Sequence, residues 1–315
     1  MGYPERIVCL TEEPTEVLYA LGEQDRIVGI SGFAVRPPRA RREKPKVSAF
    51  LSAKIERILD LRPDLVIGFS DIQADIAQAL IKAGIEVWIS NHRSVEGIRA
   101  YILRLGAMVG ATKKAHDYLA EIDAGIDRIR AQAANLPKRP RVYFEEWDEP
   151  RISGILWVAE LIRIAGGDDI FPELAAQSLA RQRILANDDE IIRRAPELVL
   201  GSWCGKKFRP DQVAARPGWA EMPAVRHGAL VEIKSPIILP HRTPSQRPHR
   251  LAACCGTRCQ RRHCFHGEPG CWCGQCRWLD ARSVDCGNCG LGGRRHVDGG
   301  GRIRFGQFAS RYRAR

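Results

Sequence analysis

Short apolar runs alternate with stretches of helical periodicity through the first hundred residues. The apolar runs predict strands at residues 6–10, 28–30, 65–68 and 85–89. Apolar residues spaced three or four positions apart predict helices between them, at residues 15–21 (capped by Thr15), 55–61 and 71–83. Strands and helices that alternate in this way predict a parallel sheet covered by helices.

A longer periodic segment lies near the middle of the chain, at residues 112–134. Its apolar face consists of Leu119, Ile122, Ile126 and Ile129, and two prolines follow it at 137 and 140. One interpretation is a further surface helix of a single α/β domain. The length of the segment and its position at mid-chain favour the other interpretation, a helix that connects two lobes.

The strand–helix pattern then starts again. Strands are predicted at residues 141–144, 197–201 and 232–239, and helices at 154–165 and 189–194. Residues 58–69 also resemble residues 191–203, because each segment runs from a helix through Pro and an acidic residue to a buried strand, a glycine and an aromatic residue. We therefore predict an α/β lobe at 1–111, a connecting helix at 112–136 and a second α/β lobe at 137–240.

Composition separates the last 75 residues from the rest. The formal net charge is +12, but residues 241–315 hold 15 Arg, no Lys and only 4 acidic residues, so the remaining chain is nearly neutral. The same segment contains nine of the eleven cysteines and only six Leu, Ile or Val residues. Too little apolar surface is present to offset the entropy of ordering it, and we predict a disordered tail rich in Cys, Arg and Gly.

The composition of this tail has three interpretations. Arginine-rich segments bind nucleic acid, with a steep dependence on salt. Cys273-x2-Cys276 and Cys286-x2-Cys289 have the spacing of a zinc site. The absence of Lys, the additional unpatterned cysteines and the lack of apolar periodicity favour the third, a GC-rich gene read out of frame. On that interpretation the second lobe is truncated, and we predict neither zinc nor nucleic acid as a partner.

The sequence shows neither an export signal nor a membrane span. The amino terminus runs directly into the first predicted strand, without a basic region, an apolar region and a cleavage site. No apolar run reaches the eighteen residues of a spanning helix. As written, the chain is expected to be cytoplasmic, with no membrane insertion.

Aromatic residues follow most of the predicted strands. In open α/β sheets, ligands bind beyond the carboxyl ends of the strands. Such an aromatic residue by itself is more often a core plug, but four of them in two facing lobes predict a wide cleft for one large, flat, partly apolar ligand. The four are Phe33, Phe69, Trp147 and Trp203. Trp203 is expected to face this cleft, and Trp88, inside a strand, to pack in the core.

An enzyme is the alternative of another class. Four acidic residues surround Trp147, and Cys204 lies beside Lys206, so a metal-dependent hydrolase could use Glu145, Glu146 and Cys204. Against it, the histidines of the two lobes are scattered, no phosphate-binding glycine loop occurs, and acids in a loop are usually solvated. We predict no catalytic residue and no metal ligand.

Several motifs resemble those of one protein family. They are the opening Arg6-Ile7-Val8-Cys9-Leu10, the segment Leu61-Arg62-Pro63-Asp64-Leu65 and its counterpart in the second lobe, Pro196-Glu197-Leu198. The family that they resemble is the substrate-binding proteins of bacterial iron-siderophore and vitamin B12 ABC importers. The segment from Ser202 to Phe208 and Arg216-Pro217-Gly218-Trp219 resemble the cobalamin-binding branch. The resemblance extends over residues 6–239.

The resemblance implies two Rossmann-like lobes with parallel sheets joined by one long helix, the class III periplasmic-binding fold. It implies non-enzymatic binding of cobalamin or a related corrinoid between the lobes, as bound ligand and not as cofactor, by a monomer that is usually periplasmic or membrane-anchored. The ligand-binding residues are then Phe33, Phe50, Phe69, Glu146, Trp147, Trp203, Cys204 and Lys206.

Other members of the resembling family imply alternatives. Siderophore relatives bind an anionic chelate with arginines, for which Arg36, Arg181 and Arg183 are candidates. Haem relatives supply a Tyr or His ligand, and no histidine is expected at these lobe edges. The family docks to its ABC permease through one acidic residue on each lobe, and the matching positions are Asp75 and Asp189.

Overall fold

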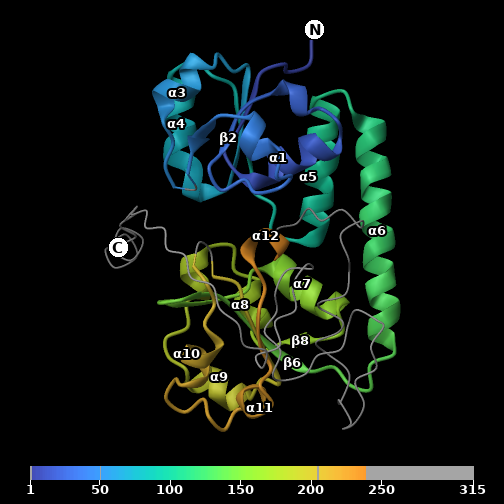
Figure 1. The fold of residues 1–315 in the computed structure, drawn as a ribbon, viewed down its shortest axis with the longest axis vertical. Helices are drawn as coiled ribbons and strands as arrows, with labels where there is room; N and C mark the ends of the chain where they lie inside the picture. Colours follow the sequence, from blue (N-terminus) through green and yellow to red (C-terminus); the bar gives the residue numbers. More distant parts are fainter. Residues whose placement is uncertain (1, 50, 204–205, 239–315) are drawn as a thin grey trace, which may run out of the picture. The chain divides into compact units, whose positions relative to one another are not determined.

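The computed structural model describes residues 2–49, 51–203 and 206–238. Phe50, Cys204 and the predicted tail at 241–315 lie outside these residues. The described chain forms two α/β lobes, one built from its first hundred residues and one from residues beyond 140, with the long helix α6 (Thr112–Ala134) between them (Figure 1). The predicted fold, two lobes joined by one long helix, is confirmed.

The first lobe contains a five-stranded, all-parallel sheet. Its strand order is β3-β2-β1-β4-β5, so the order reverses between β1 and β4, and open α/β sheets bind ligands at such a point. The strands are β1 (Ile7–Cys9), β2 (Ile27–Ser31), β3 (Lys46–Ser48), β4 (Leu65–Phe69) and β5 (Val87–Ser90). The helices are α1 (Glu12–Ala20), η1 (Gln24–Arg26), α2 (Ala40–Glu43), α3 (Ile55–Asp60), η2 (Asp71–Gln73), α4 (Ala74–Lys82) and α5 (Val95–Met108).

Two expectations for this lobe were incomplete or wrong. Helix α1 begins at Glu12 with Thr11 at its N-cap, not at Thr15, which is fully buried within the helix. Helix α5 was not predicted, although its buried residues Ile98, Tyr101, Ile102 and Leu105 have helical spacing. It packs against α6 so closely that a side chain on Gly106 would collide with Ala115.

Helix α6 is buried only near its start, at Ala115, Tyr118 and Leu119. Its contacts are with α5 of the first lobe and α7 (Leu156–Ile164) of the second. The predicted apolar face continues at Ile122, which is half-buried. Helix α6 is therefore the covalent connection between the lobes and packs on both of them.

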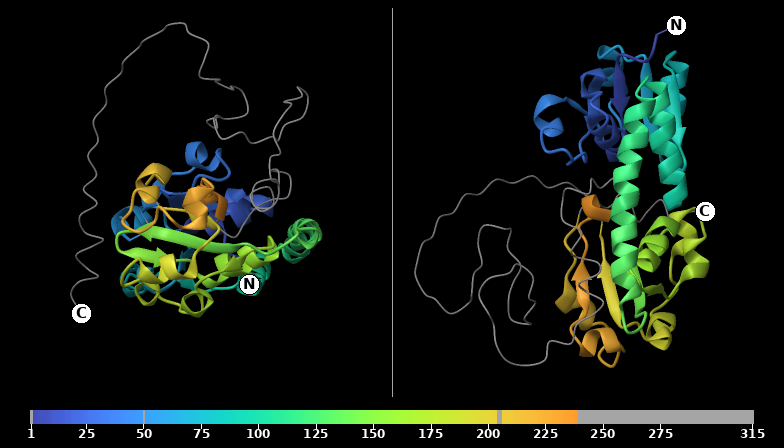
Figure 2. Two further views of the ribbon diagram at one scale, coloured as in Figure 1. Left: turned by 90° about the horizontal axis from the view of Figure 1, so that it is seen from below. Right: turned by 90° about the vertical axis from the view of Figure 1, so that its right-hand side faces the viewer.

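The second lobe contains a five-stranded mixed sheet. The order is β10-β9-β6-β7, with β8 also paired to β6, and β7 is antiparallel. Helices lie on both faces of this sheet (Figure 2). The strands are β6 (Arg141–Asp148), β7 (Arg151–Ser153), β8 (Asp168–Asp169), β9 (Leu198–Gly201) and β10 (Leu230–Glu232). Besides α7, the helices are α8 (Pro172–Ala175), η3 (Ala180–Arg183), α9 (Asp189–Arg194), α10 (Pro210–Ala214), α11 (Pro223–Arg226) and α12 (Ser235–Ile238).

The two lobes repeat one local structure where the sequences resemble each other. The residue before the proline has a left-handed backbone in both, with φ 48° at Arg62 and 45° at Ala195. An arginine at the start of the neighbouring strand donates to this carbonyl in each lobe: Arg6 Nε to Arg62 at 3.0 Å and Arg141 Nε to Ala195 at 3.0 Å. The repeat predicted from the sequence is confirmed.

The acidic residue after that proline has an equivalent role in each lobe. Asp64 accepts the backbone N–H of Arg6 at 3.0 Å, and Glu197 accepts that of Arg141 at 3.1 Å. The Pro–acid motif therefore attaches the chain that precedes β4 or β9 to the start of β1 or β6.

The described residues contain no helix that combines the length and the apolar character needed to cross a bilayer.

Candidate functional site

The predicted aromatic residues of the first lobe lie beyond β2 and at the end of β4. Phe33 is 38% exposed, which is unusual for a large apolar side chain. Phe69 is 7% exposed, and the guanidinium carbon of Arg93 lies 5.0 Å above its ring centroid. Phe33 is thus open to solvent, whereas most of Phe69 is already covered.

A histidine does lie at this lobe edge, contrary to expectation. The His92 ring is centred 4.9 Å from Phe69 and 6.3 Å from Trp157, which belongs to α7 of the second lobe. Its Nδ1 is 2.7 Å from Ser90 Oγ. Burial, and secondarily the charge of Arg93, lower the pKa of His92 to about 4, so the imidazole is neutral at physiological pH. Its position two residues past the strand β5 could have been found from the sequence.

Hydrogen bonds join the two lobes at the same place. The backbone N–H of Trp157 donates to the carbonyl of Arg93 at 2.9 Å. The carboxylate of Glu160, one turn further along α7, accepts the N–H of Val95 at the start of α5, at 2.6 Å. We call these contacts, with the packing of Trp157 on Phe69, the lobe junction.

A buried ion pair lies at the carboxyl end of β6 in the second lobe. Glu145 is fully buried, although acids in this segment were expected to be solvated. That expectation failed because β6 runs to Asp148 rather than ending at residue 144, which places Glu145 inside the sheet. Its carboxylate accepts two hydrogen bonds from Arg216, at 2.7 and 2.9 Å, and one from the Tyr143 hydroxyl at 3.1 Å.

The fourth hydrogen bond to this carboxylate comes from the Trp203 indole, at 3.1 Å. Trp203 is only 5% exposed and packs edge-on against Phe208, with ring centroids 5.0 Å apart. Little of it is thus open to a ligand in this structure. Trp88 lies inside β5 as expected, half-buried and stacked on Tyr101 with centroids 5.2 Å apart.

Three of the predicted residues do come together. Lys206 places its ammonium 5.1 Å from the ring centroid of Trp147 and 5.0 Å from that of Trp203. The same ammonium forms an ion pair with Asp148 at 2.6 Å. Trp147, Trp203 and Lys206 therefore come together. We call these three residues and Asp148 the lysine cluster.

The remaining predicted acid and the candidate arginines are mostly engaged within the protein. Glu146 accepts from Arg183 at 2.6 Å, and Arg183, only 2% exposed, also donates to the carbonyl of Ser153. Arg36 pairs with Glu16 at 2.9 Å. Of the three candidates for an anionic chelate, Arg181 alone is classed as exposed.

The structure reveals a group of buried carboxyl groups at the start of α1 that was not predicted. Burial, and next the neighbouring charge of Glu13, raise the pKa of Glu12 to about 7. Burial also raises the pKa of Glu16 to about 7, although its ion pair with Arg36 acts in the opposite direction. Glu13 itself is 5% exposed, and burial raises its pKa as well.

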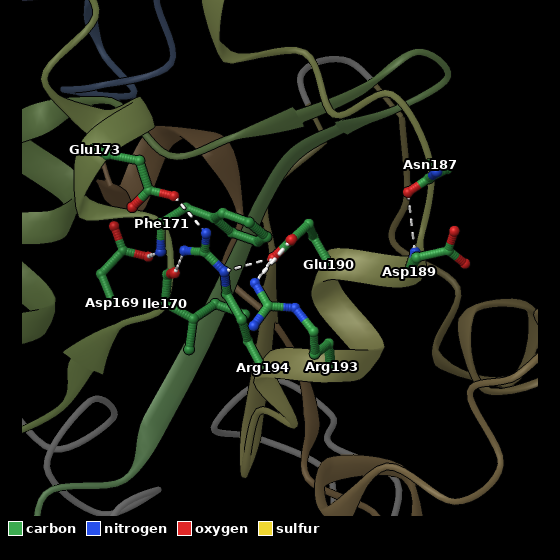
Figure 3. A network of polar contacts seen from close by, with 9 residues as sticks. All are labelled: Asp169, Ile170, Phe171, Glu173, Asn187, Asp189, Glu190, Arg193 and Arg194. Carbon is green, nitrogen blue, oxygen red and sulfur yellow. Dashed lines mark hydrogen bonds and ion pairs between the residues drawn. The ribbon is translucent and has the colours of Figure 1, made fainter.

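The two acids expected to meet a permease are exposed on different lobes. Asp75 lies in the first turn of α4. Asp189 begins α9, where its N–H donates to Asn187, and its carboxylate points away from the network around Arg194 (Figure 3). An open groove of about 640 Å³ runs along α4, lined by Ser70, Asp71, Ala74, Ala77, Gln78, Ile81, Lys82, Ile89 and Asn91.

Glu145 and Glu146, the acids considered for an alternative enzyme, form ion pairs with Arg216 and Arg183. Three side chains, Arg216, Tyr143 and Trp203, donate four hydrogen bonds to Glu145, so a metal or a catalytic water reaches it only by displacing one of them. Within residues 2–49, 51–203 and 206–238, no group of three or more His, Cys, Asp or Glu side chains could hold a metal ion.

A sequence model described as periplasmic binding protein matches residues 7–237. The chain belongs to the periplasmic binding protein family. A vitamin B12-binding protein of Vibrio vulnificus is 29% identical over 180 residues, which cover 55% of this chain and 63% of that relative. That alignment spans less than two thirds of the relative's length. The vitamin B12-binding protein of Vibrio parahaemolyticus is 26% identical and aligns over 73% of this chain and 82% of its own.

Solved structures agree with this membership. The periplasmic vitamin B12-binding protein of Vibrio cholerae has a TM-score of 0.57 at 24% identity, with 74% of this chain and 89% of that chain covered. A periplasmic haem-binding protein of Pseudomonas aeruginosa has a TM-score of 0.66 at 20% identity, covering 80% and 91%. At these identities the comparison establishes the fold of the periplasmic binding protein family, which members with different ligands share.

Proposed function

We propose that this protein binds cobalamin or a related corrinoid between its two lobes, as the substrate-binding component of an ABC-type uptake system. The observation that carries the proposal is the run of curated relatives named vitamin B12-binding protein, at 25–29% identity. The aromatic residues at the lobe edges support it, because a corrin ring presents a large, partly apolar face. The function is binding, without a catalytic step.

A ferric siderophore is the second candidate ligand. Arg181 is exposed at the start of η3 and supplies a positive charge for an anionic chelate. Arg36 already pairs with Glu16, and Arg183 with Glu146. The positive charge of these two arginines is therefore partly neutralised within the protein.

The direct test is titration of the full chain with cyanocobalamin, followed by corrin absorbance and tryptophan fluorescence. Phe33→Ala is expected to weaken binding by about 1–3 kcal/mol, the typical loss for a stacked aromatic side chain in an interface. Tyr3→Ala is the matched control, since Tyr3 is also exposed but packs on Gly110, away from the carboxyl ends of the strands. Binding of a ferric chelate or haem, but no corrinoid, would reject the proposed ligand.

Asp75 and Asp189 are our proposed contacts to the permease. Both are exposed, and they lie on helices of different lobes. Charge reversal of both is expected to abolish corrinoid uptake by cells that contain the cognate permease, while corrinoid affinity stays unchanged. A loss of affinity would place these residues in the ligand site instead.

The domain boundaries given above, and a frameshifted segment after residue 240, are also part of the proposal. Residues 239–315 lie outside the described part of the chain. Resequencing of the locus is expected to find a single-base insertion or deletion near codon 240. An intact frame together with stoichiometric zinc in the purified protein would favour the zinc site formed by the cysteines.

A further inference from the structure

The lysine cluster is a cation site built at the ends of two neighbouring strands of the second-lobe sheet. Trp147 and Asp148 end strand β6, and Trp203 follows strand β9. These strands pair in parallel, with Glu145 opposite Gly201, so the three side chains emerge at the same edge. Two indole rings within about 6 Å of one ammonium, with a carboxylate beside it, form a favourable site for an organic cation.

The two rings are held by groups other than Lys206. The Trp147 indole donates to the carbonyl of Glu149 at 2.9 Å. The Trp203 indole donates to Glu145, whose position is fixed by Arg216. Neither ring therefore depends on Lys206 alone for its orientation.

Lys206 occupies this site but is not enclosed in it. Its side chain is 44% exposed, whereas that of Asp148 is 18% exposed. Rotation about the lysine stem moves the ammonium into water without disturbing the sheet, because no backbone hydrogen bond of β6 or β9 has to break. An exposed ion pair and two partly solvated cation–π contacts are weak enough to break and re-form during binding.

We propose that Lys206 competes with the ligand for the faces of Trp147 and Trp203, and so sets the affinity and selectivity of the second-lobe wall. A flat ligand stacks on these rings only when the ammonium has left them. This inference rests on the corrinoid-binding function proposed above. It reverses the expected role of Lys206, which becomes a competitor of the ligand rather than a contact to it.

The proposal predicts that removing the Lys206 ammonium increases the affinity for the ligand. When the Lys206 ammonium has left the rings in only a fraction of the molecules, the apparent dissociation constant increases by the inverse of that fraction. Lys206→Met removes the ammonium but keeps an unbranched apolar stem, and is expected to bind cyanocobalamin about three- to tenfold more tightly. Asp148→Asn is expected to act in the same direction by a smaller factor, because it removes only the ion pair.

Lys207→Met is the matched control, since Lys207 is the exposed neighbour and loses the same charge. Its affinity is expected to equal that of wild type. The loss of one positive charge affects the affinity equally in both variants. Only Lys206→Met also removes the ammonium from the rings of Trp147 and Trp203. Salt screens the ion pair, so the advantage of Lys206→Met is also expected to narrow between about 50 mM and 1 M NaCl.

A second measurement, made without ligand, separates this inference from the proposed function. With 5-fluorotryptophan in the full chain, the 19F resonances of Trp147 and Trp203, assigned by single Trp→Phe variants, are expected to shift in Lys206→Met and not in Lys207→Met. Such shifts with no corrinoid binding in any variant reject the proposed ligand and leave the contact standing. Weaker or unchanged corrinoid binding by Lys206→Met overturns the competition, as does the absence of any 19F shift.

Discussion

The central strands β1 and β6 occupy equivalent places in the two lobes, yet the buried acids at their carboxyl ends are stabilised differently. Beyond β1, Glu12 and Glu13 start helix α1 without an arginine partner within hydrogen-bond distance in the described structure. At the end of β6, Glu145 receives two hydrogen bonds from Arg216. A buried carboxyl group avoids the cost of an unpaired charge either by taking up a proton or by pairing with a cation. Burial raises the pKa of Glu12 and Glu13 and so favours the proton there, whereas Glu145 pairs with a cation.

The largest expected effect comes from breaking the ion pair of the second lobe. Glu145→Gln leaves the Arg216 cation without its carboxylate in a buried place, and the free energy of unfolding is expected to fall by about 3–5 kcal/mol. Urea denaturation followed by tryptophan fluorescence measures the loss. The double variant Glu145→Gln/Arg216→Met is expected to recover part of it, because no charge then remains unpaired.

Full stability in the single variant would mean that Glu145 is not the counterion of Arg216. A double variant as unstable as Glu145→Gln would instead assign the loss to the hydrogen bonds from Tyr143 and Trp203.

The acids of the first lobe whose pKa is raised give a smaller effect with a defined pH dependence. The folded-state pKa of Glu12, about 7, lies above its ordinary value of 4.5, so the fold binds a proton that the unfolded chain releases between these values. The contribution of Glu12 to stability is therefore fully present below about pH 4.5 and is lost as the pH rises through 7. Glu12→Gln, which resembles the protonated acid, is expected to stabilise the protein by about 1–3 kcal/mol at pH 8 and to change little at pH 5.

Glu56→Gln serves as the control, because Glu56 is an exposed acid in the first turn of α3. Urea denaturation at pH 5 and pH 8 should show no pH-dependent difference between this variant and wild type. If Glu12→Gln is destabilising at pH 8, the carboxylate is charged and paired in the fold, and the contrast between the lobes disappears.

The smallest expected effect concerns the left-handed residue before the proline, which both lobes have. Ala195→Gly and Arg62→Gly each relieve a left-handed backbone, and each is expected to raise the free energy of unfolding by about 0.5–1 kcal/mol. The same kind of change at Ala131, exposed inside α6, should lower it by about 1 kcal/mol. Thermal unfolding shows whether the free energy of unfolding rises or falls in each variant. Opposite signs at Ala195 and Arg62 would show that the two turns are not equivalent.

The elements that could be predicted are those that a local pattern determines. The helix over 112–134 and the two helix–Pro–acid–strand segments depend on side-chain periodicity and on the fixed backbone angle of proline, which neighbouring residues alone reveal. The strand expected at 232–239 is wrong, since Ser235–Ile238 forms the helix α12. An apolar run that short is compatible with either structure, and its tertiary surroundings decide between them.

The predictions for the site were less complete because they depended on distant residues. The buried Glu145 has its counterion in Arg216, 71 residues further on, and the spacing of acids around Trp147 contains no sign of that partner. Trp203 was expected to be open, but the same carboxylate draws its indole into the core. His92 and Trp157 meet only because two lobes touch there.

The lobe junction has a consequence for the speed of ligand capture. Rotation of the lobes would break the hydrogen bonds from Trp157 to Arg93 and from Val95 to Glu160 together, while α6 limits the directions in which the lobes can move. The encounter complex is then close in shape to the final one, and no slow rearrangement follows the collision. Association rates near the 10⁵–10⁷ per molar per second typical of preformed surfaces are expected, and differences in affinity among ligands then reside mainly in how long each stays bound.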